Sequence, residues 1–437
     1  MLREGRRQEH RDKFIVTSYC ASSQTLNYDT LQFSIHKYMK GEPMPSLNVQ
    51  LDALRQSPTI AMGDRVIALK ASGRNIIGLQ VGDPDFGTPQ PVLDVAMKAL
   101  RDGLTHYGPS RGYLDLRQAA ASKLRRDNDL SYDPQTEIIV TNGGIHAYYL
   151  AMQSILNPGD DVLIPDPSWG THSNMAVMLR CNVIRVPAPA DAERGFIPHF
   201  ESWEKALTPR TRVIVLNYPS NPTGAYPTRE YLQKLQDFAE KHDLWIISDA
   251  VYENLYYEEK PTSAASFDGA KERTILVNSL SKTYAMTGWR VGFLAAPKQV
   301  INNAVKAGQN SITCVAPFIQ KAAAFALTDP GVQQTVEDMR LAYAGRRALV
   351  MRISHELESE KVLVKPPQGA FYFFLDLRPL KMTSLEICER ILEEVGVGLV
   401  PGSAFGEQGE GFVRMTIAAS DEDVETGFRK VVEWAER

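Results

Sequence analysis

The stretch SLSKTYAMTGWRVG, residues 279–292, decides both the fold and the chemistry that the chain can support. It joins two apolar runs, 274–280 and 291–296, that have the composition of buried strands. Only about nine residues separate the runs, whereas a parallel crossover needs roughly a dozen or more. We therefore predict two antiparallel neighbouring strands, with Lys282 on the loop between them.

The same loop places one lysine among groups suited to a phosphate. A lone lysine on a loop is usually a solvated surface residue. Here the loop also holds Ser279, Ser281 and Arg290, whose hydroxyl and guanidinium groups bind oxyanions well. A lysine flanked by phosphate-binding groups is what a Schiff base with pyridoxal phosphate requires.

Length and composition limit the class of protein. At 437 residues the chain exceeds the size at which single cores stop growing, so we expect two domains. A net charge of −4 gives no support for nucleic acid or an anionic membrane as partner, and no apolar run approaches a membrane span. The four cysteines are scattered and the eight histidines never recur at metal-ligand spacing. These features predict a reducing, cytoplasmic location and no metal site.

The sequence pattern changes along the chain. Residues 1–45 mix basic, acidic and polar side chains without periodicity, which predicts a disordered tail rather than a transit peptide. An alternative is that translation naturally starts at Met44. Residues 89–325 alternate strands and helices, which predicts an α/β domain with a mostly parallel sheet covered on both faces, and 326–437 predict a smaller α+β domain. The strands expected in the larger domain are 137–140, 161–164, 182–186, 213–216, 244–248, 274–280 and 291–296.

Four loops carry chemically useful side chains, and each follows the carboxyl end of a predicted strand. The loops are 142–144, 217–224, 249–252 and 279–282. In open α/β sheets ligands bind at that edge, so we expect these loops to form one site.

Asp249 ends a buried strand, a position that on its own is as often a turn or helix cap as a functional residue. A magnesium role as in P-loop ATPases is excluded because the chain has no Gly-x-x-x-x-Gly-Lys-Ser/Thr loop. Opposite a cofactor lysine, a buried carboxylate keeps the pyridine nitrogen protonated, so the ring can accept electrons. Tyr252 and Asn221 are candidates to hydrogen-bond the phenolic oxygen.

Four further residues suit the cofactor or its substrate. Gly143 and Gly144 open a helix and offer free N–H groups to a phosphate, although two glycines usually mean a tight turn. Trp169 follows another strand and could stack on a flat ring, although most tryptophans simply pack. Arg414 lies in an apolar strand, where it needs a partner, and its guanidinium fits a substrate carboxylate bidentately.

The motifs NYPSNPTG (217–224), SDAVY (248–252), SLSK (279–282) and MTGWRVG (286–292) together resemble the class I/II pyridoxal-phosphate aminotransferases of fold type I. The chain is most similar to the prokaryotic-type branch of aspartate and related aminotransferases, from about residue 50 to the end. The resemblance implies a mostly parallel seven-stranded sheet with helices on both faces and a smaller α+β domain, which residues 46–88 join.

The resemblance also implies roles for particular residues. Lys282 would form the Schiff base and then move the proton between the substrate Cα and the cofactor. Arg414 and the backbone at Gly82 would bind the substrate α-carboxylate. The cofactor contacts would be Asp249 on the pyridine nitrogen, Asn221 and Tyr252 on the phenolic oxygen, Trp169 on the ring, and Gly144, Ile145, Ser279 and Arg290 at the phosphate. Tyr107 would reach in from the partner subunit, which implies a homodimer with shared sites. The implied substrates are an L-amino acid and a 2-oxo acid in a ping-pong cycle.

One departure concerns the substrate side chain. Aspartate-specific members of this branch carry a lysine after the double glycine, where it binds the distal carboxylate of the substrate. This chain has Ile145 there, followed by His146, so a neutral or aromatic donor becomes easier to accept. Arg111 and His172 are candidates to rescue an acidic side chain.

Three alternatives differ in how well they fit. A C–S β-lyase on the same fold would keep Lys282, Asp249 and Arg414, so the motifs do not separate it from an aminotransferase. A transcription regulator would need a DNA-binding module, and the segment before residue 50 is short and aperiodic. A nicotinamide dehydrogenase would need Gly-x-Gly-x-x-Gly between a strand and a helix, and the nearest match, at 396–398, follows a helix.

Overall fold

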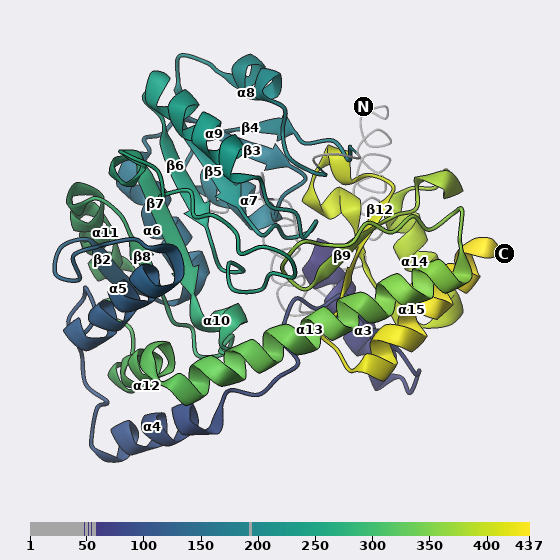
Figure 1. Ribbon diagram of the computed structural model, residues 1–437, viewed down its shortest axis with the longest axis horizontal. Coiled ribbons are helices and arrows are strands. Elements are labelled where there is room, and N and C mark those ends of the chain that lie inside the picture. The colour runs from purple at the N-terminus through teal and green to yellow at the C-terminus, as the bar shows by residue number, and fades with distance from the viewer. Residues whose placement is uncertain (1–47, 49–50, 52–53, 55–57, 192–194) are drawn as a thin grey trace, which may run out of the picture. The chain divides into compact units, whose positions relative to one another are not determined.

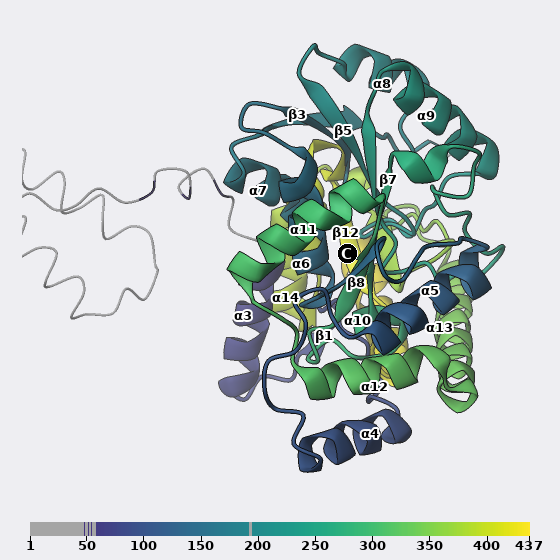
Figure 2. The ribbon, with the colours of Figure 1, turned by 90° about the vertical axis from the view of Figure 1, so that its left-hand side faces the viewer.

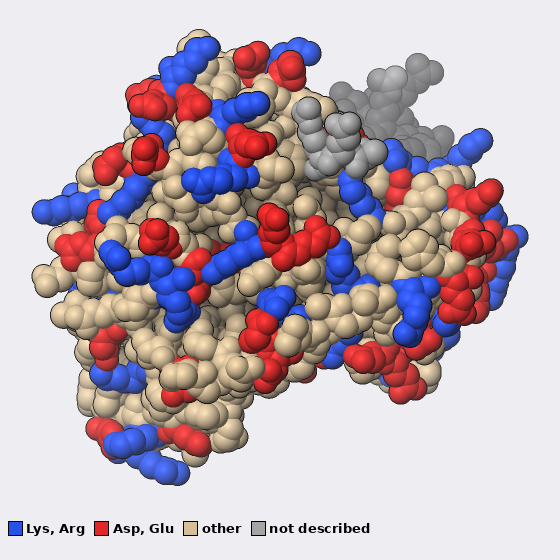
Figure 3. Space-filling view, viewed as in Figure 1, with Lys and Arg blue, Asp and Glu red and all other residues tan. Residues whose placement is uncertain are grey.

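The computed structural model describes residues 48, 51, 54, 58–191 and 195–437 (Figure 1). The predicted tail 1–45 and the alternative start at Met44 lie outside these residues, and both stay predictions. Within the described residues, no helix is both long and apolar enough to cross a bilayer. On the face drawn in Figure 3, basic and acidic side chains are interspersed, and neither sign forms a continuous patch.

A seven-stranded sheet with the order β2-β8-β7-β6-β5-β3-β4 organises the larger part of the molecule (Figure 1). Neighbouring strands are parallel except β8, which is antiparallel to both β2 and β7. The predicted mostly parallel sheet and the predicted antiparallel pair are therefore confirmed. The strands are β2 (Ile138–Thr141), β3 (Asp161–Asp166), β4 (Asn182–Pro187), β5 (Thr211–Asn217), β6 (Trp245–Asp249), β7 (Thr274–Ser279) and β8 (Gly292–Ala295).

Helices cover both faces of this sheet, as Figure 2 shows. One face packs against α6 (Gly143–Ile155), α7 (Gly170–Met178) and α11 (Lys298–Ser311). The other face packs against α4 (Gln90–Arg101), α5 (Leu114–Asn128), α8 (Phe200–Ala206), α9 (Arg229–Lys241) and α12 (Pro317–Thr328). Because successive side chains of a strand point to opposite faces, the parts of a strand that are buried on both sides are apolar, as residues 213–216 of β5 illustrate.

A smaller antiparallel sheet has the order β11-β12-β9. Its strands are β9 (Tyr372–Asp376), β11 (Val400–Pro401) and β12 (Phe412–Thr416), and its helices are α13 (Pro330–Leu357), α14 (Ser384–Val395) and α15 (Asp421–Glu436). The segment before the larger domain contributes α3 (Pro58–Ala71) and β1 (Ile77–Gly78), and β1 pairs in parallel with β10 (Val397–Gly398). Strand β1 is only two residues long. Short 3-10 helices are η2 (Ala270–Glu272), η3 (Arg378–Leu380), η4 (Gly402–Phe405) and η5 (Glu407–Gly409).

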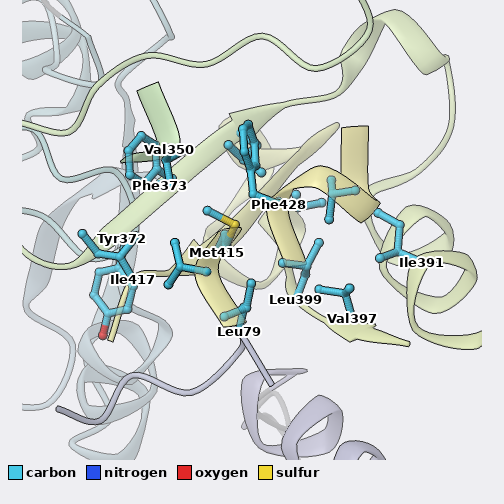
Figure 4. Packing of buried hydrophobic residues seen from close by; sticks show 14 of the residues in the cluster. Leu79, Val350, Tyr372, Phe373, Ile391, Val397, Leu399, Met415, Ile417 and Phe428 are labelled. Carbon is cyan, nitrogen blue, oxygen red and sulfur yellow. The ribbon is translucent and has the colours of Figure 1, made fainter. Parts of the chain in front are cut away.

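Alternation along β9 and β12 divides their side chains between two faces. Phe373 and Met415 pack into the core beneath α13 and α15, beside Phe428 (Figure 4). Tyr372 and Arg414 belong to the opposite set of positions, and Figure 4 shows the Tyr372 hydroxyl pointing away from this core. One face of the small sheet therefore carries the polar groups of Tyr372 and Arg414, and its other face packs into a hydrophobic cluster.

Residues 53–437 form one compact unit, so the predicted boundary at 325/326 stays a prediction.

Lys282 lies in a short helix, α10 (Leu280–Thr283), and the prediction of a loop was wrong here. The reason is local: the side chain of Ser279, at the end of β7, accepts a hydrogen bond from the Ser281 N–H at 3.1 Å and caps the turn. The cap fixes the direction in which Lys282 leaves the sheet edge.

A buried ion network joins helix α5 to the segment after β6 and to strand β7. The Lys123 ammonium contacts Glu253 and lies 3.1 Å from Asp127, and all three side chains are at most 9% exposed. The Glu253 carboxylate also accepts hydrogen bonds from the Asn278 and Asn128 amides at 2.6 and 2.9 Å. Burial lowers the pKa of Lys123, but Glu253 and Asp127 raise that pKa by more, so the lysine stays charged.

Replacing Lys123 by methionine should lower the free energy of unfolding by about 3–5 kcal/mol, because the Glu253 carboxylate would stay buried without its cation. The double variant Lys123→Met, Glu253→Gln should recover most of that loss, because no buried charge is then left unpaired at that position. Urea unfolding of the apoprotein measures both effects. A single variant as stable as the parent, or a double variant no better than the single, would contradict this explanation.

Candidate active site

The carboxyl ends of β2, β5, β6 and β7 lie at one edge of the large sheet and carry the four predicted loops. Strand β8 lies between β2 and β7 and runs in the opposite direction, so its first residue, Gly292, reaches the same edge. A Cβ on Gly292 would lie 2.6 Å from the Asn278 carbonyl oxygen and 3.1 Å from the Gly143 carbonyl carbon. This close approach brings the loop after β2 against the end of β7, as predicted.

Helix α6 begins at Gly143, where the glycine pair was predicted to open a helix, and its amino end meets Arg290. The Arg290 Nη1 donates to the Thr287 carbonyl at 2.7 Å, which fixes the guanidinium. A Cβ on Gly143, whose φ is +80°, would lie 2.6 Å from Arg290 Nη2. A Cβ on Gly144 would lie 3.3 Å from the Ser279 Cβ. The two glycines therefore let a guanidinium and a serine approach the positive end of a helix, an arrangement that fits a phosphate.

The Asp249 carboxylate is bound by a histidine that the sequence prediction assigned elsewhere. His172 Nε2 lies 3.1 Å from Asp249 Oδ2, and both side chains are buried. The imidazole packs against the Tyr148 ring at 4.7 Å and the Trp169 ring at 5.3 Å. His172 is thus committed to Asp249, and the hypothesis that it receives an acidic substrate side chain was wrong.

Arg111 does not point to the site either. Its Nη1 donates to the Gln135 and Thr136 carbonyls at 3.0 and 3.1 Å, and its Nη2 donates to Asn302 Oδ1 at 3.0 Å. These bonds hold the loop that precedes α5, so the hypothesis that Arg111 rescues an acidic substrate was also wrong.

Arg414 is buried and connects three parts of the chain. Its Nη1 donates to Asn221 Oδ1 at 2.9 Å, and its Nη2 donates to the Gln80 carbonyl at 2.7 Å. Its guanidinium lies over the Tyr372 ring at 4.4 Å and over the Phe405 ring at 5.2 Å. In the described part of the chain no carboxylate pairs with it, and its Nε has no partner. A buried cation in this state suits a bidentate carboxylate ligand.

Tyr252, on the loop after β6, has a partner that the sequence prediction missed. Its hydroxyl lies 2.9 Å from the Tyr372 hydroxyl. Burial raises the pKa of Tyr252 well above its usual value, so the phenol keeps its proton. Asn221 is fixed from its backbone, because its N–H donates to Asn217 Oδ1 at 3.0 Å, and its side-chain amide lies beside Arg414.

Lys282 lies at the centre of these groups. Its Nζ donates to the Gly82 carbonyl at 2.5 Å. Burial is the main cause that lowers the pKa of Lys282 to about 8; the Arg414 and Arg290 guanidinium groups act in the same sense, and Asp83 and Asp249 act in the opposite sense. A lysine with this pKa holds far more neutral amine at neutral pH than an ordinary lysine, and the neutral amine is the form that attacks a carbonyl group.

The remaining predicted residues occupy the rim of the site or its surroundings. Ser281 Oγ accepts from Ser279 Oγ at 2.9 Å, beside the amino end of α6. Trp169 precedes α7 with its ring against His172. Tyr107 is 87% exposed and Ile145 is 43% exposed, so other residues of this chain cover neither side chain fully.

Sequence reasoning missed three contributors: His172 as the partner of Asp249, Tyr372 and the Lys123 network. A signal existed for the first, because a carboxylate at the end of a buried strand needs a partner. Tyr372 stands in the apolar run 371–375, where a phenol also needs a hydrogen-bond partner. Lys123 has no comparable signal, because α5 reads as an ordinary amphipathic helix.

Comparison with known proteins identifies the family. The model of the family "Aminotransferase class I and II" matches residues 74–431. The chain belongs to this family. The aspartate aminotransferase of Pyrococcus abyssi (strain GE5 / Orsay) is 41% identical over 362 residues, which cover 83% of this chain and 92% of that protein. Aromatic-amino-acid aminotransferase 2 of Thermococcus litoralis is 42% identical over 351 residues, covering 80% and 89%.

A solved structure agrees with this assignment. Aspartate aminotransferase from Thermus thermophilus with maleate matches with a TM-score of 0.84 and 36% identity, covering 89% of this chain and 100% of that chain. The aminotransferase therefore has fold type I, depends on pyridoxal 5'-phosphate and transfers amino groups. The comparisons do not favour the C–S lyase alternative.

The lowered pKa of Lys282 predicts the pH dependence of its reactivity in the apo-aminotransferase. Because burial disfavours the ammonium form, the rate of Lys282 acetylation by trace acetic anhydride should rise with pH with a midpoint near 8. In urea-denatured protein the same peptide should titrate near the ordinary lysine value of roughly 10.4. Quantitative mass spectrometry of the digest measures both curves. Coinciding curves would contradict the assigned environment.

Proposed function

We propose that the aminotransferase holds pyridoxal phosphate through the residues that the sequence predicted. The observation that carries this proposal is the convergence of Lys282, Asp249 and the Gly143–Arg290 contact on one sheet edge. Gly143, Gly144, Ile145, Ser279, Ser281 and Arg290 would hold the phosphate. When bound, the cofactor supplies an electron sink for the substrate Cα.

The surrounding side chains would hold the ring and control protons. The Asp249 carboxylate, fixed by His172 at 3.1 Å, would keep a proton on the pyridine nitrogen. The amide of Asn221 and the hydroxyl of Tyr252 would donate to the phenolic oxygen, and Trp169 would stack on the ring. Lys282, as a neutral amine, would remove and return the proton at the substrate Cα.

The substrate α-carboxylate would bind to Arg414 and to the backbone at Gly82, beside Trp169 and Asn221. The unpartnered Nε and the absence of a paired carboxylate among the described residues support this role of Arg414. Because Arg414 lies on β12 of the small sheet and Asn221 on the loop after β5 of the large sheet, substrate binding would also hold the two sheets together.

We also propose a donor with an uncharged side chain. Ile145 stands where an aspartate-specific relative would place a lysine, and Arg111 and His172 are both bound elsewhere. The two relatives named above differ on this point, since one is named for aspartate and the other for aromatic amino acids. The argument for a neutral or aromatic donor is therefore that Ile145 carries no charge and that Arg111 and His172 are bound elsewhere.

A homodimer in the cytoplasm completes the proposal. Tyr107 and Ile145 are exposed hydrophobic side chains, and Val81, next to Gly82, is 46% exposed. A second copy of the chain would cover these side chains and bring its own Tyr107 to the phosphate.

A panel of L-amino acids tests the donor class. The cofactor absorbance should change with neutral or aromatic donors, and 2-oxoglutarate should restore it. Reaction with aspartate or glutamate alone would overturn the donor proposal. Release of ammonia and a 2-oxo acid without any acceptor would favour an eliminating enzyme instead.

The variant Ile145→Lys should raise kcat/KM for aspartate relative to phenylalanine by roughly 10- to 100-fold, the effect of one charged hydrogen bond. Ile145→Met, which has similar length and no charge, is the control and should leave the ratio within about threefold of the parent. Equal ratios in both variants would show that position 145 does not face the substrate side chain.

A further inference from the structure

Tyr372 lies between the cofactor side and the substrate side of the proposed site. In the register of the small sheet, Arg414 on β12 is opposite Phe374 and therefore diagonal to Tyr372 on β9. Diagonal neighbours on one face of a sheet are within reach of aromatic and long side chains. The Tyr372 side chain is 1% exposed, and it touches both Arg414 and Tyr252.

The ring of Tyr372 fixes the plane of a guanidinium. Arg414 lies over the Tyr372 and Phe405 rings, at 4.4 and 5.2 Å from their centroids. Its two hydrogen-bond partners, Asn221 and the Gln80 carbonyl, are neutral. A desolvated guanidinium is attracted to aromatic faces, so two such contacts restrict how far the plane of the guanidinium can tilt. The rings thus orient the fork before any carboxylate arrives.

The hydroxyl of Tyr372 acts on a different group. Tyr252 has one hydroxyl proton, and if it donates that proton to a ligand, its own oxygen can only accept. The Tyr372 hydroxyl, 2.9 Å away, is placed to donate to it. Burial raises the pKa of both phenols, so both protons are present at neutral pH. A chain of hydrogen bonds pointing in one direction strengthens each of its members.

The space around this hydroxyl is closely defined. A Cβ on Gly82 would lie 2.4 Å from the Tyr372 Oη, so only glycine leaves room for it. The same Gly82 accepts a hydrogen bond from Lys282 through its carbonyl. The charged and titratable groups that act on Tyr372 are Arg414, Tyr252 and Asp83.

We propose that Tyr372 is a positioning residue with two separable roles in the transamination site. Its ring orients Arg414 toward the substrate α-carboxylate, and its hydroxyl directs the Tyr252 proton toward the phenolic oxygen of the cofactor. The inference rests on the proposed function, in which Arg414 and Tyr252 have those two ligands.

The variant Tyr372→Phe keeps the ring and removes the hydroxyl. The pH midpoint of the bound-cofactor absorbance should rise by about half a unit, because a weaker donor stabilises the deprotonated form less. The Michaelis constant for the best donor should stay within about twofold of the parent, because the cation–π contact remains.

The variant Phe405→Leu is the matched control, because Phe405 stacks on Arg414 and has no contact with Tyr252. It should raise the Michaelis constant roughly tenfold, with kcat within about threefold, and leave the absorbance midpoint unchanged. Tyr372→Met removes both the ring and the hydroxyl and should show both effects. Calorimetry of 3-phenylpropanoate binding to the cofactor-loaded protein measures the affinity of Arg414 for a carboxylate without turnover. The measurement can therefore be made even if no donor reacts.

A Tyr372→Phe variant with an unchanged midpoint would overturn the hydroxyl role. A Tyr372→Met variant that binds 3-phenylpropanoate as tightly as Tyr372→Phe would overturn the ring role of Tyr372. If Tyr372→Met fails to fold, Tyr372→Leu, which also lacks the ring and the hydroxyl, makes the same comparison with Tyr372→Phe. The protein could fail to transaminate while Tyr372→Phe still shifts the absorbance midpoint and loss of the Tyr372 ring still weakens 3-phenylpropanoate binding. That result would reject the proposed function and keep the positioning role.

Discussion

Three cations, Lys282, Arg290 and Arg414, converge on one site from three different elements, and the rest of the structure depends on accommodating them. Arg414 is fully buried, and the pKa of Lys282 falls to about 8 chiefly because of burial. Partly desolvated cations without counter-ions are costly, and anionic ligands offset that cost. A phosphate beside Arg290 and a carboxylate beside Arg414 would do so, which explains why the site favours a phosphorylated cofactor and an amino acid.

Two sheets are required to bring these cations together. The large sheet supplies Lys282, Arg290 and Asp249, because the ends of parallel strands lie side by side at one edge. The small sheet supplies Arg414, and the Arg414–Asn221 hydrogen bond joins the two sheets at the site. The buried Lys123–Glu253 pair helps to fix the end of β7. Glu253 accepts a hydrogen bond from Asn278, which directly precedes Ser279.

The placements of strands and strand ends that the sequence predicted correctly are those set by short-range constraints. The distance between two apolar runs required β7 and β8 to be antiparallel neighbours, and the strand ends located Asp249 and Lys282. The parts that it missed depend on tertiary pairing. His172 bonds Asp249 across 77 residues, and Tyr372 meets Tyr252 across 120. Arg111 was assigned wrongly for the same reason, because its partners are two backbone carbonyls and the distant Asn302 side chain, and none of them carries a sequence signal.

The site's chemistry depends on one covalent attachment, and its location is the most direct test of this account. The protein loaded with pyridoxal phosphate would be reduced with borohydride, digested and examined by mass spectrometry. We predict a single pyridoxyl group on Lys282, absent from a Lys282→Ala variant that also lacks turnover. A label on another lysine, or full turnover without Lys282, would contradict the account.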